Sequence, residues 1–363
     1  MFVVTINAEV LQFFDPLDIK NSDSLNFNTT FFMANDPVSL NEFFDDWSKE
    51  YHPKNGDNLA LQDLRLDLGG FFKGYYLGYY YRYNVFIRTN RDFTDFYYTA
   101  KNKLPFDSRK IYYLELRIRG IKEQGLLLSK NIILLRSGTE ELRFGAAVAI
   151  SAGYDMQNGI ISGTAHILGK KNYEISATAH YYYTHNYLYD LDVKDSNGFG
   201  FGNHFALSYI NKLHSFGTKI IINDLFSRIY WNNLPYSFVN IQTENKLYDE
   251  NGYIKYAPSI NGAERYIGFI QKITPRYKLV LCKDFLNEIR LTIGSIYSDK
   301  EFFPYFRINT RLLDLYDMTL TYESRFKSFG IGFGNKYFKT GIALDELQNP
   351  SAFNLYGKFI YPF

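Results

Sequence analysis

Strict alternation of apolar and polar side chains is the feature that most constrains the fold of this chain. One clear run, NYEISATAHYYY, begins at Asn172, and a second, IYYLELRIRG, begins at Ile111. A third, DMTLTYESRFK, begins at Asp317. Because side chains two residues apart lie on the same face of an extended strand, runs of this kind predict β-strands.

Similar runs of about ten residues, separated by clusters of Gly, Asn, Asp, Ser or Lys, recur from Leu64 to the end of the chain. They predict an all-β protein with about 14 to 16 strands, if each strand and its turn take about 20 residues. Asn158-Gly159 is predicted as a hairpin turn. Residues 89–110 and 223–262 break the rhythm and are predicted as long loops.

The polar faces of these strands carry full charges, which leaves two interpretations. In a soluble antiparallel sheet the charged face meets bulk water, whereas in a membrane barrel it lines a wet lumen. The run GYYLGYYYRYNVFI, from Gly74, favours the barrel because its tyrosines share one face and tyrosine suits the lipid headgroup boundary. The mean hydropathy is only −0.26, and no apolar stretch is long enough for a membrane-spanning helix.

Charge and cysteine content exclude some classes of protein. With 40 basic and 38 acidic residues the net charge is +2, which argues against a nucleic-acid-binding chain. The single cysteine, Cys282, cannot form an internal disulfide, and its expected role is a small apolar side chain in a strand.

The region before the alternating runs has a different character. Residues 2–6 are apolar and fit either a truncated export signal or a first strand. An N-cap and a first-turn proline at Asp36-Pro37 precede apolar residues at helical spacing, which predicts an amphipathic helix reaching Tyr51. We therefore expect two parts: residues 1–60, a segment with a short helix that is a plug or a cap, and residues 61–363, a transmembrane barrel.

The C-terminal sequence FNLYGKFIYPF resembles the last strand of Gram-negative outer-membrane β-barrels, which ends in Phe with apolar residues at every second position before it. Phe359, Tyr361 and Phe363 match that pattern, whereas Pro362 departs from it. The resemblance implies that the outer-membrane assembly machinery reads this strand, that the strand closes the barrel against the first one, and that outer-membrane lipid surrounds it. The helix-containing segment before the barrel is similar in layout to FadL-like fatty-acid transporters, whose amino-terminal segment plugs a 14-stranded barrel, although the Asn-Pro-Ala motif of that family is not found.

Catalytic signals are weak throughout, so the chain is predicted not to be an enzyme and to need no cofactor. It has no G-x-S-x-G elbow, H-E-x-x-H motif or P-loop. His180, His185 and His204 fall on neighbouring predicted strands, but spacing alone does not show convergent ligands, and no metal site is predicted.

The charged faces supply the candidate lumen residues. These are Arg82, Glu115, Arg117, Arg119, Glu174, His180, Arg290, Arg307, Arg311, Glu323 and Arg325. Arginine outnumbers acid among them, which favours anionic solutes. The alternative is that these arginines form structural pairs across the lumen and leave no open path.

The leading interpretation is an outer-membrane channel or transporter for a small or amphipathic solute, with a basic lumen. The first alternative is an outer-membrane barrel that anchors or assembles a surface or secretion system, with residues 223–262 as its docking loop. The second is a secreted β-sandwich or propeller that binds glycans through its tyrosines.

Overall fold

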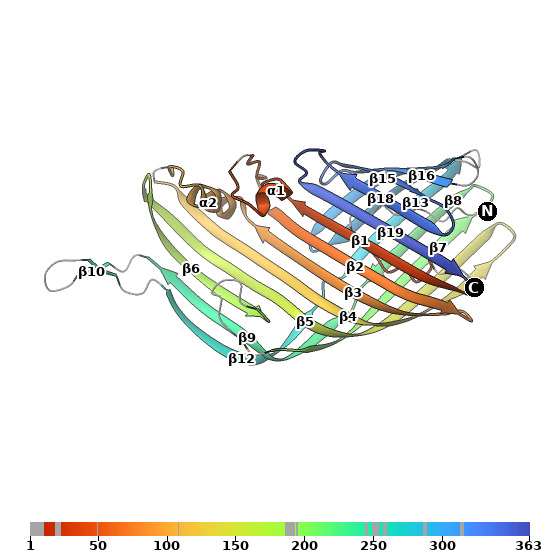
Figure 1. Cartoon of the computed structure of the whole chain (residues 1–363), viewed down its shortest axis with the longest axis horizontal. Helices are drawn as coiled ribbons and strands as arrows, with labels where there is room; N and C mark the ends of the chain where they lie inside the picture. The colour runs from red at the N-terminus through yellow and green to blue at the C-terminus, as the bar shows by residue number, and fades with distance from the viewer. Residues whose placement is uncertain are drawn as a thin grey trace.

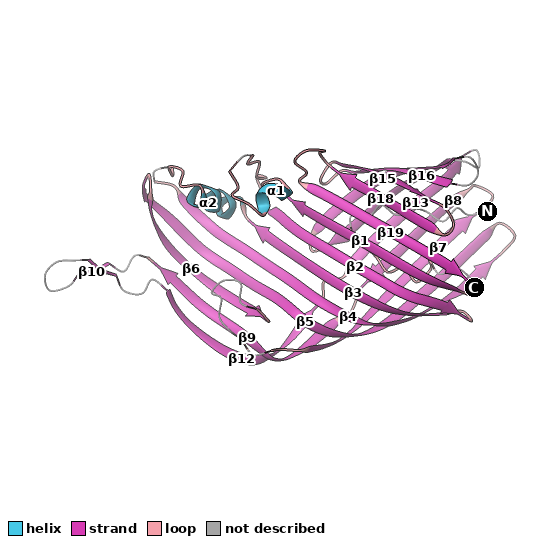
Figure 2. Ribbon diagram, viewed as in Figure 1, coloured by secondary structure: helices cyan, strands magenta, loops and turns pink. Residues whose placement is uncertain are grey.

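The structure is a computed structural model that describes residues 11–18, 23–48, 50–107, 109–185, 193, 195–243, 246–248, 254–256, 260–285, 289–312 and 316–363. Strands dominate it, and two helices lie at one end (Figures 1 and 2). We call that end the helical end, and the opposite end, where the C-terminus lies, the terminal end. No helix in these ranges is long and apolar enough to cross a membrane.

The helices are α1 (Leu40–Phe43) and α2 (Arg91–Lys101). The first nine strands are β1 (Ser24–Asn35), β2 (Asn58–Phe72), β3 (Tyr75–Thr89), β4 (Ile111–Arg136), β5 (Glu140–Gly169), β6 (Asn172–Tyr183), β7 (Gly198–Asn211), β8 (Phe216–Asn223) and β9 (Arg228–Gln242). The others are β10 (Lys246–Tyr248), β11 (Ile254–Tyr256), β12 (Ile260–Lys272), β13 (Arg276–Phe285), β14 (Ile289–Ser298), β15 (Glu301–Leu312), β16 (Tyr316–Glu323), β17 (Ser328–Gly334), β18 (Phe338–Leu344) and β19 (Ala352–Pro362).

Antiparallel pairing closes the sheet into a barrel. The ring runs β1-β2-β3-β4-β5-β7-β8-β13-β14-β15-β16-β17-β18-β19 and returns to β1, which makes fourteen strands among the described residues. Closure removes the free edges of the ring, so every ring strand has a neighbour on both sides. The predicted all-β antiparallel barrel is confirmed, and its strand number lies within the predicted range.

Three wall positions consist of two strand segments in succession: β6 then β7, β8 then β9, and β12 then β13. The three interruptions, which we call the strand breaks, lie at one level of the wall. Arg228 of β9 is opposite both Phe201 of β7 and Lys272 of β12, while Asn223 of β8 is opposite Arg276 of β13. Beyond the breaks, β5 pairs with β6, β6 with β9, and β9 with β12, so this part of the wall continues toward the helical end.

The two strand faces separate by polarity as the alternation predicts. On β3, the exposed Tyr75, Leu77 and Tyr79 face outward, whereas Tyr80 and Arg82 are buried in the lumen. An apolar outer face and a polar inner face is the arrangement of a barrel whose outside meets lipid. The soluble-sheet interpretation is therefore replaced by the membrane-barrel one.

The C-terminal strand lies where the sequence places it. β19 pairs with β1 over its whole length, from Ala352 opposite Ala34 to Pro362 opposite Ser24. Phe359, Tyr361 and Phe363 point outward and are 51–67% exposed. The prediction that the last strand closes the barrel against the first is confirmed, while its reading by an assembly machinery stays a prediction.

The region before residue 61 differs from its prediction in three ways. The predicted helix is a single turn, α1, capped by Ser39 instead of Asp36. β1 lies in the barrel wall, so the wall begins at Ser24 and not at residue 61. Residues 11–18, and not the helix, occupy part of the lumen; residues 2–6 lie outside the described ranges.

Three predictions within the barrel region were wrong. Residues 89–110 contain α2, whose Phe96 packs with Phe106 and Tyr112 over the outer face of β4 at the helical end. Residues 223–262 contain β9 and the start of β12. Asn158-Gly159 lies inside β5, where Gly159 is opposite Tyr181 of β6. A glycine there leaves room for the ring, because an added Cβ would lie 2.9 Å from Tyr181.

Candidate functional site

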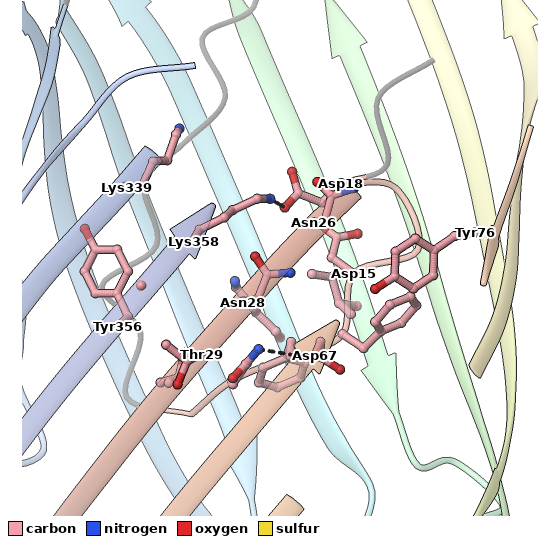
Figure 3. Close-up of a pocket in the computed structure, with 17 residues that line it drawn as sticks. Asp15, Asp18, Asn26, Asn28, Thr29, Asp67, Tyr76, Lys339, Tyr356 and Lys358 are labelled. Atoms are coloured by element: carbon pink, nitrogen blue, oxygen red, sulfur yellow. Dashed lines mark hydrogen bonds and ion pairs between the residues drawn. The ribbon is translucent and has the colours of Figure 1, made fainter. Parts of the chain in front are cut away.

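Residues 11–18, which we call the plug, occupy the lumen (Figure 3). Gln12 donates a hydrogen bond of 2.8 Å to Asp67 of β2. Phe14 is held by both its backbone groups: its N–H donates to the Asn223 side chain at 2.8 Å, and its carbonyl accepts from the same amide at 2.9 Å. Because these partners come from β2 and β8, the plug is tied to separate parts of the barrel wall.

The plug's acidic residues are tied to lysines of the wall toward the terminal end. Asp15 pairs with Lys219 of β8 at 2.7 Å, and Asp18 pairs with Lys358 of β19. A pocket of about 90 Å³ remains beside the plug, bordered by Tyr356. That volume holds a few water molecules and no larger solute.

A layer of paired charges crosses the lumen beside the plug. Arg82 of β3 contacts Glu123 of β4 at 2.7 Å and Asp224 beyond β8 at 2.6 Å. Arg276 of β13 reaches Asp63 of β2 at 2.7 Å. All five side chains are at most 5% exposed. Arg65 and Asp67, both on β2, add a buried pair at 2.9 Å. We call these seven residues the charged layer.

A larger cavity of about 410 Å³ lies on the helical side of the charged layer, next to the strand breaks. We call it the lumen cavity. Its lining includes apolar side chains from β3, β4, β12 and the β12–β13 connection: Phe86, Ile121, Phe269, Ile273 and Pro275. Its charged lining includes the cations Arg82, Arg119 and Arg276 and the carboxylate Asp299. The cavity therefore combines an apolar wall with a positive charge bias.

Aromatic side chains extend from the lumen cavity along the lumen face of β6, β9 and β12. The ring of Tyr182 lies 4.4 Å from Phe269 of the cavity lining and 4.6 Å from Tyr236. The Tyr236 hydroxyl shares a hydrogen bond of 2.7 Å with Nδ1 of His180, whose ring is 5.0 Å from Phe238. We call these five side chains the aromatic strip.

The predicted residues of β3 and β4 share the lumen face but have different surroundings. Arg82 belongs to the charged layer. Arg119 pairs with Asp299 at 2.8 Å and lines the lumen cavity. Glu115 and Arg117 pair with each other at 2.8 Å and remain about half exposed toward the helical end.

The histidine positions do not converge. His180 belongs to the aromatic strip, whereas the ring of His204 on β7 lies 5.7 Å from Phe14 of the plug. Glu174 lies opposite His166, near the β5–β6 turn and away from both sites. In the described ranges, His, Cys, Asp and Glu side chains form no group of three or more that could hold a metal ion.

The predicted residues of β14 to β17 form pairs within the wall or at its rim. Arg290 binds Asp284 at 2.7 Å, and Arg307 contacts Thr321 at 3.4 Å. Arg311 shares the lumen face with Arg307, four positions along the same strand. Glu323 accepts a backbone hydrogen bond of 3.0 Å from Phe326.

Arg325 connects the rim at the helical end. It binds both carboxylate oxygens of Asp36 at 2.9 Å and Glu301 at 2.8 Å. Asp36 also pairs with Lys54 at 2.7 Å. Burial raises the pKa of Asp36 above its ordinary value, and the Arg325 guanidinium opposes that shift.

Sequence reasoning expected a plug or cap within residues 1–60 but assigned it to the helix instead of residues 11–18, and it missed most of the charged layer. The stretch DLRLD from Asp63 has the signal that could have identified three members, because Asp63, Arg65 and Asp67 alternate with leucines. Asp224 and Arg276 lie at strand breaks, where alternation is interrupted. Residues 11–18 carry no periodic signal, so only the tertiary structure reveals their position.

Comparisons with known proteins give only distant similarities. No protein-family model and no curated protein matches the chain. A TodX deltaS2S3 mutant monoaromatic hydrocarbon channel is similar, with a TM-score of 0.49, 8% identity, and coverage of 95% of this chain and 91% of that chain. The CymD monoaromatic hydrocarbon channel has a TM-score of 0.28 and 8% identity, with coverage of 96% of this chain and 91% of that chain. The outer membrane protease OmpT from Escherichia coli has a TM-score of 0.23 and 10% identity, with coverage of 94% of this chain and 95% of that chain.

Similarities at these identities and TM-scores carry no argument about function, and they include both channels and a protease. The fold assignment therefore rests on the strand pairings and on the apolar outer face. This is the architecture of the bacterial outer-membrane β-barrels, and the chain is a barrel of that type.

Proposed function

We propose that the protein is a channel for a small amphipathic anion, closed by the plug in the state described here. The lumen cavity is the observation that supports this function. A lining that is apolar on one side and carries cations on the other suits a solute with an apolar body and an acidic group. A volume of about 410 Å³ is in the range of small-molecule sites.

Arg119 is the candidate contact for the acidic group. Its side chain is 55% exposed and is paired with Asp299 at 2.8 Å, so it remains accessible from the helical end. Arg82 and Arg276 also line the cavity, but buried carboxylates already pair with them. The aromatic strip provides apolar contacts that lead toward Phe269 in the cavity lining.

The plug closes the path on the terminal side. Its ties to Asp67, Asn223, Lys219 and Lys358 are polar contacts, and such contacts can exchange with water when the plug moves. Passage requires that residues 11–18 leave the lumen at least transiently.

Planar-bilayer recordings test the channel directly. We compare the full chain with a variant in which residues 11–18 are replaced by a Gly/Ser linker of equal length. The linker variant should conduct several-fold more current, because the chain no longer fills the lumen. An equally silent linker variant that still shows heat-modifiable gel migration would contradict a channel and favour an anchoring role.

Solute class is tested by uptake into liposomes that contain the protein. Benzoate and octanoate should enter faster than a neutral sugar of similar size, and Arg119→Gln should reduce that preference. Arg117→Gln is the matched control, because Arg117 lies on the same strand face but outside the lumen cavity. Equal entry of neutral and anionic solutes through the unmodified protein would contradict the anion preference.

A further inference from the structure

Lysines gather in the lumen wall on the terminal side of the charged layer. We call the following four side chains, from β8, β13, β18 and β19, the lysine cluster: Lys219, Lys278, Lys339 and Lys358. Lys278 and Lys339 are only 4% and 3% exposed. In the described lining of the pocket beside the plug, the barrel wall contributes three of these lysines and one carboxylate, Asp67, which already pairs with Arg65. The wall at this level therefore carries an excess of positive charge.

Two members of the lysine cluster face each other across neighbouring strands. Lys339 of β18 lies directly opposite Lys358 of β19, and like charges in that position destabilise a strand pair. Asp18 of the plug binds Lys358 beside this pair, as Figure 3 shows. Asp15 binds Lys219 on the other side of the plug at 2.7 Å. The structure thus shows that the lysine cluster accepts carboxylates.

The plug also carries apolar groups next to its carboxylates. Phe13 and Phe14 directly precede Asp15 in the sequence. The ring centroid of Phe13 lies 5.7 Å from Nζ of Lys278, and the ring of Phe14 lies 5.6 Å from that of Tyr76. An aromatic ring beside a carboxylate is also the chemistry of a small amphipathic anion.

We propose that the lysine cluster is a second binding site for the carboxylate of the solute, and that the plug occupies this site as an internal competitor. The inference rests on the proposed function, because the anion that replaces the plug is the solute of the lumen cavity. When the plug leaves, the lysines that held its carboxylates lose their partners, which is unfavourable at partly buried positions. An anion that binds these lysines only in that state shifts the equilibrium toward release of the plug. A neutral solute has no such preference and leaves the plug in place.

Release of the plug is measured by the reactivity of a thiol within it. In a Cys282→Ala background, Leu17→Cys places a thiol between Asp15 and Asp18, at a position that is 9% exposed when the plug is bound. A bulky, uncharged polyethylene glycol maleimide reaches this thiol only after the plug moves. Sodium benzoate should accelerate the labelling several-fold and to saturation. Benzamide at the same concentration and sodium chloride at the same ionic strength should have little effect.

Substitutions in this background separate competition from simple loosening of the plug. Asp18→Asn should raise the labelling rate without benzoate about tenfold, because it removes a charge-assisted contact. It should also lower the benzoate concentration that gives half of the full effect, since a weaker competitor is easier to displace. Lys339→Gln should raise that concentration about tenfold, because it removes a contact to the anion. Lys130→Gln is the matched control: Lys130 lies on the outer face of β4 and contacts Tyr75, so its benzoate response should not change.

Two results of the labelling experiment would overturn the lysine site. Equal acceleration by benzamide or by sodium chloride would show that apolar contact or charge screening releases the plug, and not carboxylate binding. A benzoate response that is the same in Lys339→Gln and Lys130→Gln would show that the lysine cluster does not hold the anion. Heat-modifiable gel migration confirms that each variant is a folded barrel before it is labelled.

Comparison with the liposome experiment distinguishes this inference from the proposed function. Labelling that does not respond to benzoate, although benzoate enters liposomes through the unmodified protein, would overturn the competition and leave the channel intact. Labelling that responds to benzoate without any transport would support the lysine site and contradict the channel.

Discussion

At the scale of single residues, the charged layer depends on pairing each of its buried arginines with a carboxylate. Arg82 is 3% exposed and contacts two acids, Glu123 of β4 and Asp224 just beyond β8. A buried ion pair adds little net stability compared with an apolar pair, but removal of one partner leaves an uncompensated charge. The charged layer is therefore more sensitive to single substitutions than the charges at the helical end.

Arg82→Met should destabilise the barrel by about 3–5 kcal/mol, because Glu123 and Asp224 would remain buried without their cation. Arg117→Met is the control: Arg117 and Glu115 are about half exposed, and such a pair contributes under about 1 kcal/mol. The measurement is the denaturant midpoint for loss of heat-modifiable gel migration. Equal midpoints for the two variants would contradict a structural role for the charged layer.

Gly198 is a second position at which one residue is expected to affect stability strongly, because it lies against Trp231. An added Cβ at Gly198 would lie 2.5 Å from Ile229 and 2.9 Å from Trp231, and both neighbours are buried. We expect Gly198→Ala to cost about 1–3 kcal/mol through overpacking. Gly56→Ala is the matched substitution, since nothing lies within 4 Å of the added Cβ there, and its unfolding midpoint in denaturant should not fall.

At the scale of elements, the places where strands are interrupted shape the lumen more than the lengths of the strands do. The strand breaks separate β7, β8 and β13, which complete the ring, from β6, β9 and β12, which extend the wall. The lumen cavity and the aromatic strip both arise at or beyond this level. The last strand, by contrast, is continuous and lies in full register against β1.

The terminal strand carries the prediction that belongs to this scale. Deletion of Phe363 should reduce the amount of barrel inserted in the outer membrane several-fold. The reason is that Phe363 is the final residue of the C-terminal pattern that resembles the last strand of outer-membrane barrels. Phe72→Ala is the control, as Phe72 is another outward aromatic residue, 55% exposed, at the end of β2. Membrane fractionation measures both, and normal insertion without Phe363 would contradict the assembly role.

At the scale of the whole molecule, closure joins the first and last strands of the ring, β1 and β19. Leu25 lies opposite Tyr361, and Phe27 opposite Phe359, on the outer face of the β1–β19 seam. The seam brings together strands more than 300 residues apart, so its register depends on every strand between them. Such distant pairing is slow to form and depends on the complete ring.

A disulfide across the seam tests the closure. In a Cys282→Ala background, Leu25→Cys with Tyr361→Cys should oxidise nearly completely, because the two residues are directly opposed. Leu25→Cys with Phe359→Cys is displaced by two residues, which separates the Cα atoms by about 7–8 Å, and it should oxidise poorly. Mass spectrometry of the oxidised protein measures both yields, and similar yields would contradict the register.

The sequence by itself determined the strand class, the faces of the strands and the terminal strand, because all three follow from a period of two that each segment shows locally. It also indicated that Arg82, Arg119 and Arg325 face inward. Alternation identifies the face of a residue but not its partner, so it could not show that Asp224 and Asp36 pair with Arg82 and Arg325.

The plug, the strand breaks and α2 were decided only by the tertiary structure. Residues 11–18 lie in the lumen because their partners on β2, β8 and β19 converge there, and no local pattern encodes that convergence. The breaks are places where alternation stops, which a sequence reading takes for loops. Contacts between residues 55 to 340 positions apart therefore hold the plug, whereas a period of two within each segment is enough to predict the strands and their faces.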